Sequence, residues 1–217
     1  TGQFAGEHRI RQTRIDWNAS YSYANKRQPD RRIVERQKDP SNGIDQYQID
    51  QSFISRDFIS LDEHIASAAA NLSQPLNPSS ENPIELRAGI YGEYKTRTYK
   101  TRAFEYKWDI DADLPQGFAS LPIWEIMVPS NLGVDKIHIN DQSEPTDNYK
   151  ANKHLEAVYA AFNIPLGKFN IYTGARLEMF RTAVTSFGNV SNTKRVYDYI
   201  NLLPSLNATY NFNKNSL

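Results

Sequence analysis

Cysteine is absent from the 217-residue sequence, which excludes disulfide scaffolds and thiolate metal sites. Long apolar runs are absent as well, and without a run of about 18 apolar residues no transmembrane helix is expected. This does not exclude a membrane, because a barrel strand needs only about 10 residues, of which alternate ones must be apolar. The 25 basic and 25 acidic residues cancel, so bulk charge gives no reason to expect a nucleic-acid partner.

Catalytic and metal-binding motifs are also missing. The sequence has no glycine-rich phosphate loop and no Gly-x-Ser-x-Gly elbow. The four histidines do not have the spacing of metal ligands. They are His8, His64, His138 and His154. We therefore expect no enzyme, no cofactor and no metal site.

Aromatic residues are abundant in a chain that is otherwise poor in apolar residues. Only 39% of the residues are hydrophobic, yet 13 are tyrosine and 10 are phenylalanine. Aromatic side chains of this kind suit surfaces that are apolar on one side and wet on the other. The mean hydropathy of −0.66 is compatible with a barrel whose strands alternate.

Apolar and polar residues alternate with period two in four segments, near residues 15–23, 84–95, 169–179 and 205–212. Such alternation predicts strands with two different faces. In the second segment Ile84, Leu86 and Ile90 share one face, while charged residues occupy the other. Residues 61–72 and 155–164 alternate less strictly, and residues 2–10 are a further candidate strand. A soluble β-sandwich also alternates, but strands of about 12 to 16 residues are longer than its usual strands.

Short and long connections follow one another along the chain. Long polar connections are expected near residues 26–59, 99–150 and 185–198, with short turns between them. Transmembrane barrels show this pattern, because their periplasmic turns are short and their external loops are long. The alternating tract 102–108 is interpreted as a strand extension or a hairpin beyond the membrane.

The predicted fold is all-β, with about seven or eight antiparallel up-and-down strands over residues 1–217. So few strands, with bulky charged residues on their polar face, do not suit a small closed barrel, whose interior is filled. We therefore expect a segment of a large transmembrane β-barrel. Because the chain begins at Thr1 without a charged and then apolar leader, we also expect a processed start or an internal piece.

Several motifs resemble those of TonB-dependent outer-membrane receptors, particularly those of Bacteroidetes-like bacteria. Residues 199–212, YINLLPSLNATYNF, are similar to the family's LLPSLNxxYxF strand. Residues 167–178 resemble its GxRxE strand, and residues 86–97 its KxGxYxxxKxR strand. Residues 16–22 followed by Pro29 and Asp30 look like its DWxxSYSxAxxxxPD strand and loop. Each motif is loose, but their order and spacing make the combination specific.

The resemblance implies a barrel of about 22 strands in the bacterial outer membrane, occluded by an N-terminal plug. It also implies energy-coupled import of a scarce nutrient, an iron chelate, a glycan or a peptide, driven through the TonB complex. The plug and the TonB-contacting segment precede the barrel in that family, and neither is found in these residues. The implied partners are outer-membrane lipid, the plug and the TonB complex. A surface lipoprotein is a further candidate partner, for the apolar tract of residues 118–127.

Candidate site residues fall into three groups, in an outer loop, along the lumen and in an aromatic girdle. In the outer loop, Phe118 and Trp124 belong to an unusually apolar tract and could contact a ligand, although packing within the loop is the plainer interpretation. Asp109, Asp111 and Asp113 have alternate spacing, but they lack the glycine and glutamate of a calcium loop. The lumen-lining candidates are Glu85, Arg87, Glu93, Arg176 and Glu178. Candidates for an aromatic girdle are Trp17, Tyr21, Tyr23 and Tyr94.

Two alternatives to a TonB-dependent receptor remain at this point. One is another barrel class, a passive porin-like channel or an adhesin, which would lack the plug. The other is a soluble all-β binding or carbohydrate-active module. The soluble module would bury Ile84, Leu86, Ile90, Ile171 and Leu177 in a compact core.

Overall fold

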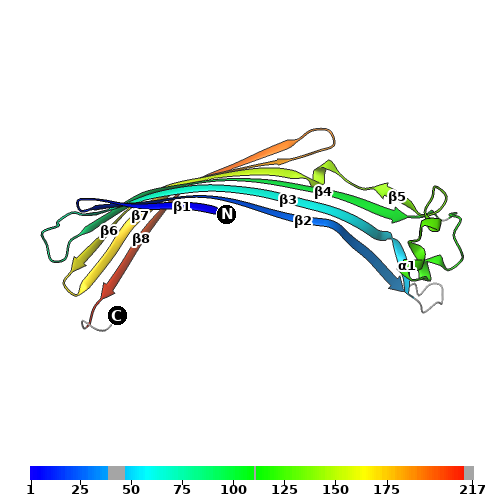
Figure 1. The fold of residues 1–217 in the computed structure, drawn as a ribbon, viewed down its shortest axis with the longest axis horizontal. Helices are drawn as coiled ribbons and strands as arrows, with labels where there is room; N and C mark the ends of the chain where they lie inside the picture. Colours follow the sequence, from blue (N-terminus) through cyan, green and yellow to red (C-terminus); the bar gives the residue numbers. More distant parts are fainter. Residues whose placement is uncertain (39–46, 110, 213–217) are drawn as a thin grey trace.

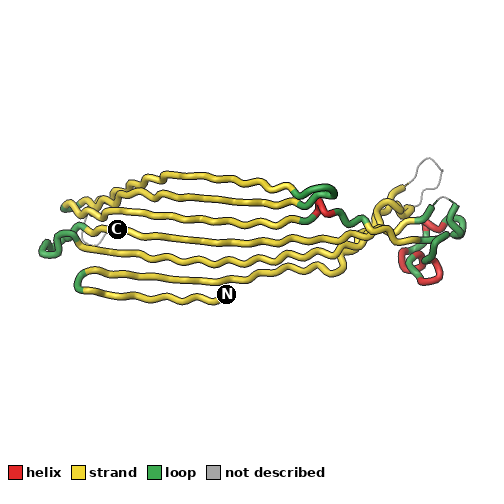
Figure 2. Tube along the Cα trace, turned by 90° about the horizontal axis from the view of Figure 1, so that it is seen from above, coloured by secondary structure: helices red, strands yellow, loops and turns green. Residues whose placement is uncertain are grey.

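A computed structural model describes residues 1–38, 47–109 and 111–212 and shows one antiparallel sheet of eight strands (Figures 1 and 2). The strands are β1 (Gly2–Ile10), β2 (Thr13–Lys38), β3 (Tyr47–Pro75), β4 (Glu85–Lys107), β5 (His138–Asp141), β6 (Tyr149–Leu166), β7 (Phe169–Ser186) and β8 (Thr193–Tyr210). Among these residues, no helix is long and apolar enough to cross a membrane.

The strands form an up-and-down meander in the order β1-β2-β3-β4-β6-β7-β8, and the short β5 pairs only with β4. Each long strand is antiparallel to the one before it, as hairpin connections require. The sheet forms a gentle arch and does not close, because β1 and β8 lie at opposite edges (Figures 1 and 2). The prediction of an all-β, antiparallel, up-and-down segment is confirmed.

Short turns join the strands at one end of the sheet. Residues 11–12 connect β1 to β2, residues 76–84 connect β3 to β4, and residues 167–168 connect β6 to β7. Gly167 has a φ of 61°, which glycine adopts without strain. Arg11 has a φ of 56° and is the one non-glycine residue with positive φ in the described chain. The expected short turns are thus all at the same end.

The first of the three predicted long loops is wrong in its secondary structure. Within residues 26–59, β2 continues to Lys38 and β3 begins at Tyr47, so that only the tip at 39–46 lies outside the described residues. Pro29 and Asp30 fall in a β-bulge between Gln28 and Arg31 rather than in a loop. A strand this polar can form here because most side chains of β2 beyond Gln28 are exposed to water.

The other two predicted loops are shorter or more ordered than expected. Within residues 99–150, β4 runs to Lys107, as the alternating tract 102–108 predicted, and β5 adds a short paired segment. Within residues 185–198, only 187–192 lie between β7 and β8. We use the term extension for the parts of β2, β3 and β4 that lie beyond Gln28, before Ile59 and beyond Thr101.

A small hydrophobic core lies at the end of the extension, in what we call the cap (residues 108–109 and 111–141). The cap contains short helices over Phe118–Ser120 (η2), Ile123–Ile126 (α1) and Pro129–Asn131 (η3), and η4 (Pro145–Asp147) follows it. Its buried residues Phe118, Ile126 and Ile137 pack on the extension, against Ile49, Ile54 and Tyr106. Figure 1 shows α1 at the end of the sheet that is opposite the short turns.

Candidate functional site

The two faces of the sheet carry different side chains. We call the side of Ile90 the outward face and the side of Tyr91 the inward face. Strand register places one apolar row across the outward face. This row is Trp17, Ala70, Ile90, Val158, Leu177 and Leu202. Ile90 is 60% exposed, so this face is not a compact protein core. A monomeric soluble protein rarely exposes so large an apolar surface.

The apolar band has the height that a membrane requires. On β4 and the residue before it, the band runs from Ile84 to Tyr94, ten residue steps, or about 33 Å along the strand. At the tilt of about 40° that is typical of barrel strands, this gives a height of about 25 Å. The apolar band of outer-membrane barrels has the same height.

Aromatic and histidine rings border the apolar band at the end nearer the cap. The rings of Tyr94 and His154 lie 4.6 Å apart, and those of Tyr23 and His64 lie 4.8 Å apart. The Tyr21 hydroxyl is 2.7 Å from Nδ1 of His64. Beyond this row the outward face turns polar, as in the pair between the Tyr23 hydroxyl and Asp62 at 2.7 Å. Rings with polar tips suit the membrane interface. The predicted girdle tyrosines therefore lie at this border of the band, whereas Trp17, which was predicted with them, lies within the band in the row of Ile90.

The inward face carries a hydrogen-bond network across β2, β3 and β6. Asn71 donates to Asp16 at 2.7 Å, and the Tyr159 hydroxyl donates to Oδ1 of Asn71 at 3.0 Å. Tyr159 reaches Asn71 across Gly89, where an added Cβ would lie 2.5 Å from Cε1 of Tyr159. The glycine therefore lets the tyrosine lie flat over the strand between the two partners.

A second inward network joins β4, β6 and β7 through charged groups. The Tyr91 hydroxyl donates to Glu93 at 2.9 Å, and Lys153 pairs with the same carboxylate at 3.1 Å. Lys153 also lies 5.3 Å from the centroid of the Phe180 ring. Arg176 donates to Glu178 at 2.7 Å, and its guanidinium lies 5.8 Å from the Tyr91 ring centroid. Charges and aromatic faces thus alternate along the wall.

Toward the cap, the inward face binds one carboxylate between two cations. Glu63 is 8% exposed and accepts from Lys95 at 2.8 Å and from Arg97 at 2.7 Å. A carboxylate this buried needs such partners, because an unpaired charge would cost several kcal/mol. The wall therefore carries fixed, mutually neutralised charges rather than a single-sign patch.

The five predicted lumen-lining residues share the inward face. Register aligns Glu93 with Leu155, Arg176 with Tyr159 and Glu178 with Ala157, while Glu85 and Arg87 lie on the same side of β4 and pair at 2.9 Å. Sequence reasoning missed Asn71, Lys153 and Tyr159. Asn71 and Tyr159 lie in the weakly alternating segments, where alanines occupy both faces and hide the period, and Lys153 lies just before the second of these segments.

The outer-loop candidates differ in their exposure to solvent. Phe118 is 5% exposed and packs edge-on against Trp108 with ring centroids 5.5 Å apart, so it is a core residue of the cap. Trp124 is 73% exposed. Asp109, Asp111 and Asp113 are exposed, and no group of three acidic or histidine side chains in the described residues could hold a metal ion. Of these candidates, Trp124 and the three aspartates remain accessible.

The outward side of the extension carries ion pairs beside aromatic rings such as those of Phe58 and Phe104. Asp30 accepts from Arg56 at 2.7 Å and from Arg32 at 2.6 Å, and Arg56 donates to the Tyr106 hydroxyl at 3.2 Å. The hydrogen bonds from Arg56 and then Arg32 lower the pKa of Asp30 to about 2. The extension therefore lies in water beyond the lipid.

Residues 130–217 match the model of an outer membrane protein beta-barrel family. No curated protein and no solved structure matches the chain. The matched residues contain β5, β6, β7 and β8. The protein is located in the bacterial outer membrane, and its sheet is a segment of an outer-membrane β-barrel.

Proposed function

We propose that this sheet is part of the barrel wall of a TonB-dependent receptor, which imports a scarce nutrient across the outer membrane. The observation that carries the proposal is the inward face, with its continuous networks of charged and hydrogen-bonded side chains. In a small barrel such side chains would have to fill the interior, whereas in a large one they border a wet lumen or a plug.

The open edges of the sheet support a large barrel. Among the residues that the structure describes, β1 pairs only with β2, and β8 pairs only with β7. Unpaired strand edges are not tolerated in lipid, because each unsatisfied backbone group costs several kcal/mol. Further strands must therefore complete the ring, and about 22 in total is the size that the resemblance of residues 199–212 implies.

The inward face suits contact with a plug. Its charges are paired within the wall, as in Glu63 with Lys95 and Glu93 with Lys153, so a plug that slides or unfolds past them meets fixed partners. We propose that the nutrient, an iron chelate, a glycan or a peptide, is captured by the outer loops, where Trp124 and the aspartates at 109, 111 and 113 are exposed. A surface lipoprotein is a proposed partner of the cap, and we expect no catalysis.

A passive channel or an adhesin would have the same lipid-facing band. Neither needs energy from the inner membrane, which is the property that separates them from the receptor. The outer-membrane location removes the support for a soluble binding module.

Energy-coupled uptake is the direct test. The gene that encodes the intact protein is deleted, and growth is measured on limiting iron chelates, on glycans and on peptides as the only source. The deletion is expected to abolish growth on one class, and loss of TonB in the undeleted strain is expected to abolish the same growth. Uptake that persists without TonB would show a passive channel and overturn the proposal.

A further inference from the structure

A hollow opens where β4 and β6 part. Their pairing ends at Tyr99 and Tyr149, and residues 142–148 then run beside β4 without a regular ladder. Two side chains replace the missing ladder partners of β4. Asn148 Oδ1 accepts from the Thr101 amide at 2.8 Å, and Ser143 Oγ accepts from the Ala103 amide at 3.0 Å. The hollow is lined by β4, by this linker and by residues of the 187–192 turn.

Three cationic side chains line this hollow, Lys100, Arg102 and Lys150. All three belong to the outward face, because they lie an even number of residues from Ile90 on β4 or from Val158 on β6. Lys100 and Lys150 are exposed, and neither has an ion-pair partner in the part of the chain that the structure describes.

The acidic groups near the hollow are already engaged. Asp141 pairs with Arg102 at 2.9 Å, and the hydrogen bonds from Ser143 and then from Arg102 lower its pKa. Glu144, which also lines the hollow, accepts from Nδ2 of Asn189 at 2.8 Å. The Asn189 amide is uncharged, so Glu144 keeps its negative charge, and the three cations exceed the two carboxylates by one positive charge on this outward surface.

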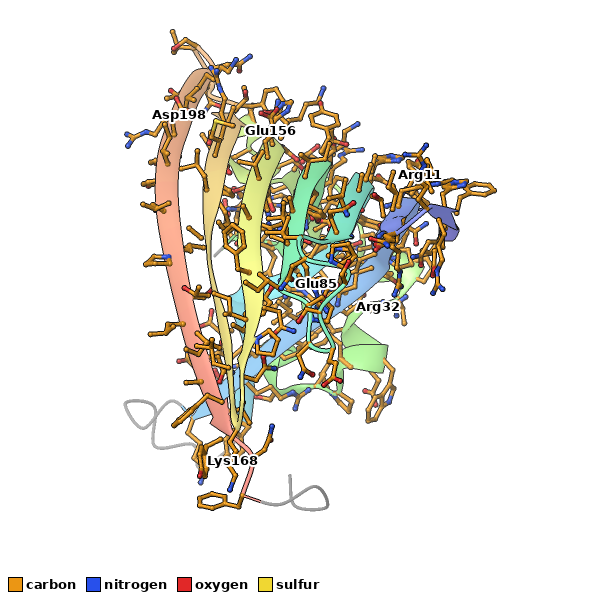
Figure 3. All side chains as sticks on the ribbon, turned by 90° about the vertical axis from the view of Figure 1, so that its left-hand side faces the viewer. Arg11, Arg32, Glu85, Glu156, Lys168 and Asp198 are labelled. Atoms are coloured by element: carbon orange, nitrogen blue, oxygen red, sulfur yellow. The ribbon has the colours of Figure 1, made fainter. Side chains whose placement is uncertain are left out.

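The height of the hollow narrows the choice of ligand. Lys100 lies six residues beyond Tyr94, which is about 20 Å along the strand and about 15 Å along the membrane normal at a tilt of about 40°. The headgroup layer of an ordinary bilayer is only about 5–8 Å thick on each side. The short turns lie at the opposite, periplasmic end of the sheet, where Lys168 is labelled in Figure 3, so the hollow is on the outer side.

We propose that this hollow binds the phosphorylated sugar headgroup of an outer-leaflet glycolipid. Lysine and arginine are the usual binding groups for phosphate, and clustered cations on a lipid-facing surface recognise anionic headgroups. A phospholipid headgroup is too short to reach Lys100, whereas a headgroup of several sugars reaches it. The site does not depend on TonB coupling or on the imported nutrient.

Lipid retention by the purified intact protein tests the site. The protein is placed in nanodiscs with lipopolysaccharide that has a phosphorylated core, with lipid A that lacks the core sugars, or with phosphatidylglycerol. Bound lipid is then counted by native mass spectrometry. The paired variant Lys100→Gln with Lys150→Gln is compared with Lys168→Gln, which changes a lysine at the periplasmic turn. Heat-modifiable migration checks that each variant folds.

The paired variant is expected to retain at least ten-fold less core-bearing lipopolysaccharide, with no change in Lys168→Gln and a weaker effect in high salt. Equal retention by the paired variant would overturn the site. Equally tight binding of lipid A or phosphatidylglycerol would overturn the headgroup assignment. Displacement by millimolar inorganic phosphate alone would show a simple anion site and overturn the glycolipid.

Discussion

The membrane-spanning sheet and the cap use apolar residues in opposite ways. In the sheet, Ile90 and its row point away from the protein, and the polar side chains face inward. In the cap, Ile126 is 0% exposed and packs among other apolar residues on the extension. One chain therefore has two solvents. Where lipid is the solvent apolar side chains are placed outside, and where water is the solvent they are buried.

The difference extends to the way in which each region is held together. The sheet is stabilised by its unbroken backbone ladders, together with the inward networks around Asn71, Glu93 and Glu63. The cap has little regular structure and depends on a small core that includes Phe118 and Ile137. Truncation of a core side chain should therefore strongly destabilise the cap. The sheet should instead be destabilised when a charged residue is placed on its lipid-facing side.

The largest effect is expected in the cap core. Ile126→Ala removes a fully buried side chain and should lower the free energy of unfolding of the cap by about 2–5 kcal/mol. The control is Trp124→Ala in the same short helix, which removes an exposed ring and should change the stability by less than about 0.5 kcal/mol. Amide hydrogen exchange of residues 118–137 measures both. Equal protection in the two variants would contradict the cap core.

The next effect compares the two faces of β8. Leu202→Arg places a charge in the lipid-facing row and should destabilise the barrel by about 2–4 kcal/mol. Its neighbour Asn201 faces inward opposite Glu178, so Asn201→Arg should cost little. Urea midpoints of the intact protein folded into vesicles give both values. A larger cost for Asn201→Arg would mean that the faces are assigned the wrong way round.

A smaller effect compares two glycines of β4. In Gly89→Ala the new Cβ would collide with Tyr159 and with Asn71, so we expect a loss of about 1–3 kcal/mol and displacement of the Tyr159 ring. Gly92 has no atom within 4 Å of an added Cβ, so Gly92→Ala should be tolerated. The same vesicle unfolding experiment applies. If Gly89→Ala and Gly92→Ala lower the stability equally, the Tyr159 ring does not lie over β4 at Gly89.

The smallest effect depends on pH and concerns the extension. The pKa of Asp30 is about 2 in the folded protein, against 3.8 ordinarily, because Arg56 and Arg32 hold its charged form. Its contribution to stability is complete above pH 3.8 and is lost as the pH falls toward 2. In Asp30→Asn this part of the pH dependence should vanish. Hydrogen exchange of the extension from pH 5 to pH 2 measures the difference in stability between the unsubstituted protein and Asp30→Asn. A difference that stays constant over this pH range would contradict the role of the Asp30 charge.

The sequence predicted the parts of the fold in which the two solvents differ. Alternation in residues 84–95 and 169–179 placed Ile90 and Leu177 on one face and Glu93 and Arg176 on the other, as the register does. Such alternation is strict because a one-residue slip would expose every charge to lipid. The mixed face of residues 61–72 hid Asn71, because alanine is tolerated on both sides.

The extension and the cap were harder to predict. Beyond the membrane both faces of a strand can be polar, so the period vanishes and β2 near Pro29 has the composition of a loop. The tract 118–127 was correctly noted as apolar, but the sequence alone does not show that Phe118 is buried and Trp124 exposed. That distinction depends on contacts with Ile49 and Ile54, which are distant in the chain.

Single cysteines along β8 test the assignment of lipid and water faces most directly, since the chain has no cysteine of its own. Each of residues 199 to 203 is replaced by cysteine in turn, in the intact protein in vesicles, and is probed with a water-soluble maleimide and, after labelling, with a lipid-soluble quencher. We expect quenching by the lipid-soluble quencher at positions 200 and 202, in place of Ile200 and Leu202. We expect labelling by the water-soluble maleimide at positions 199, 201 and 203, in place of Tyr199, Asn201 and Leu203. Equal maleimide reactivity at all five positions would contradict a membrane wall.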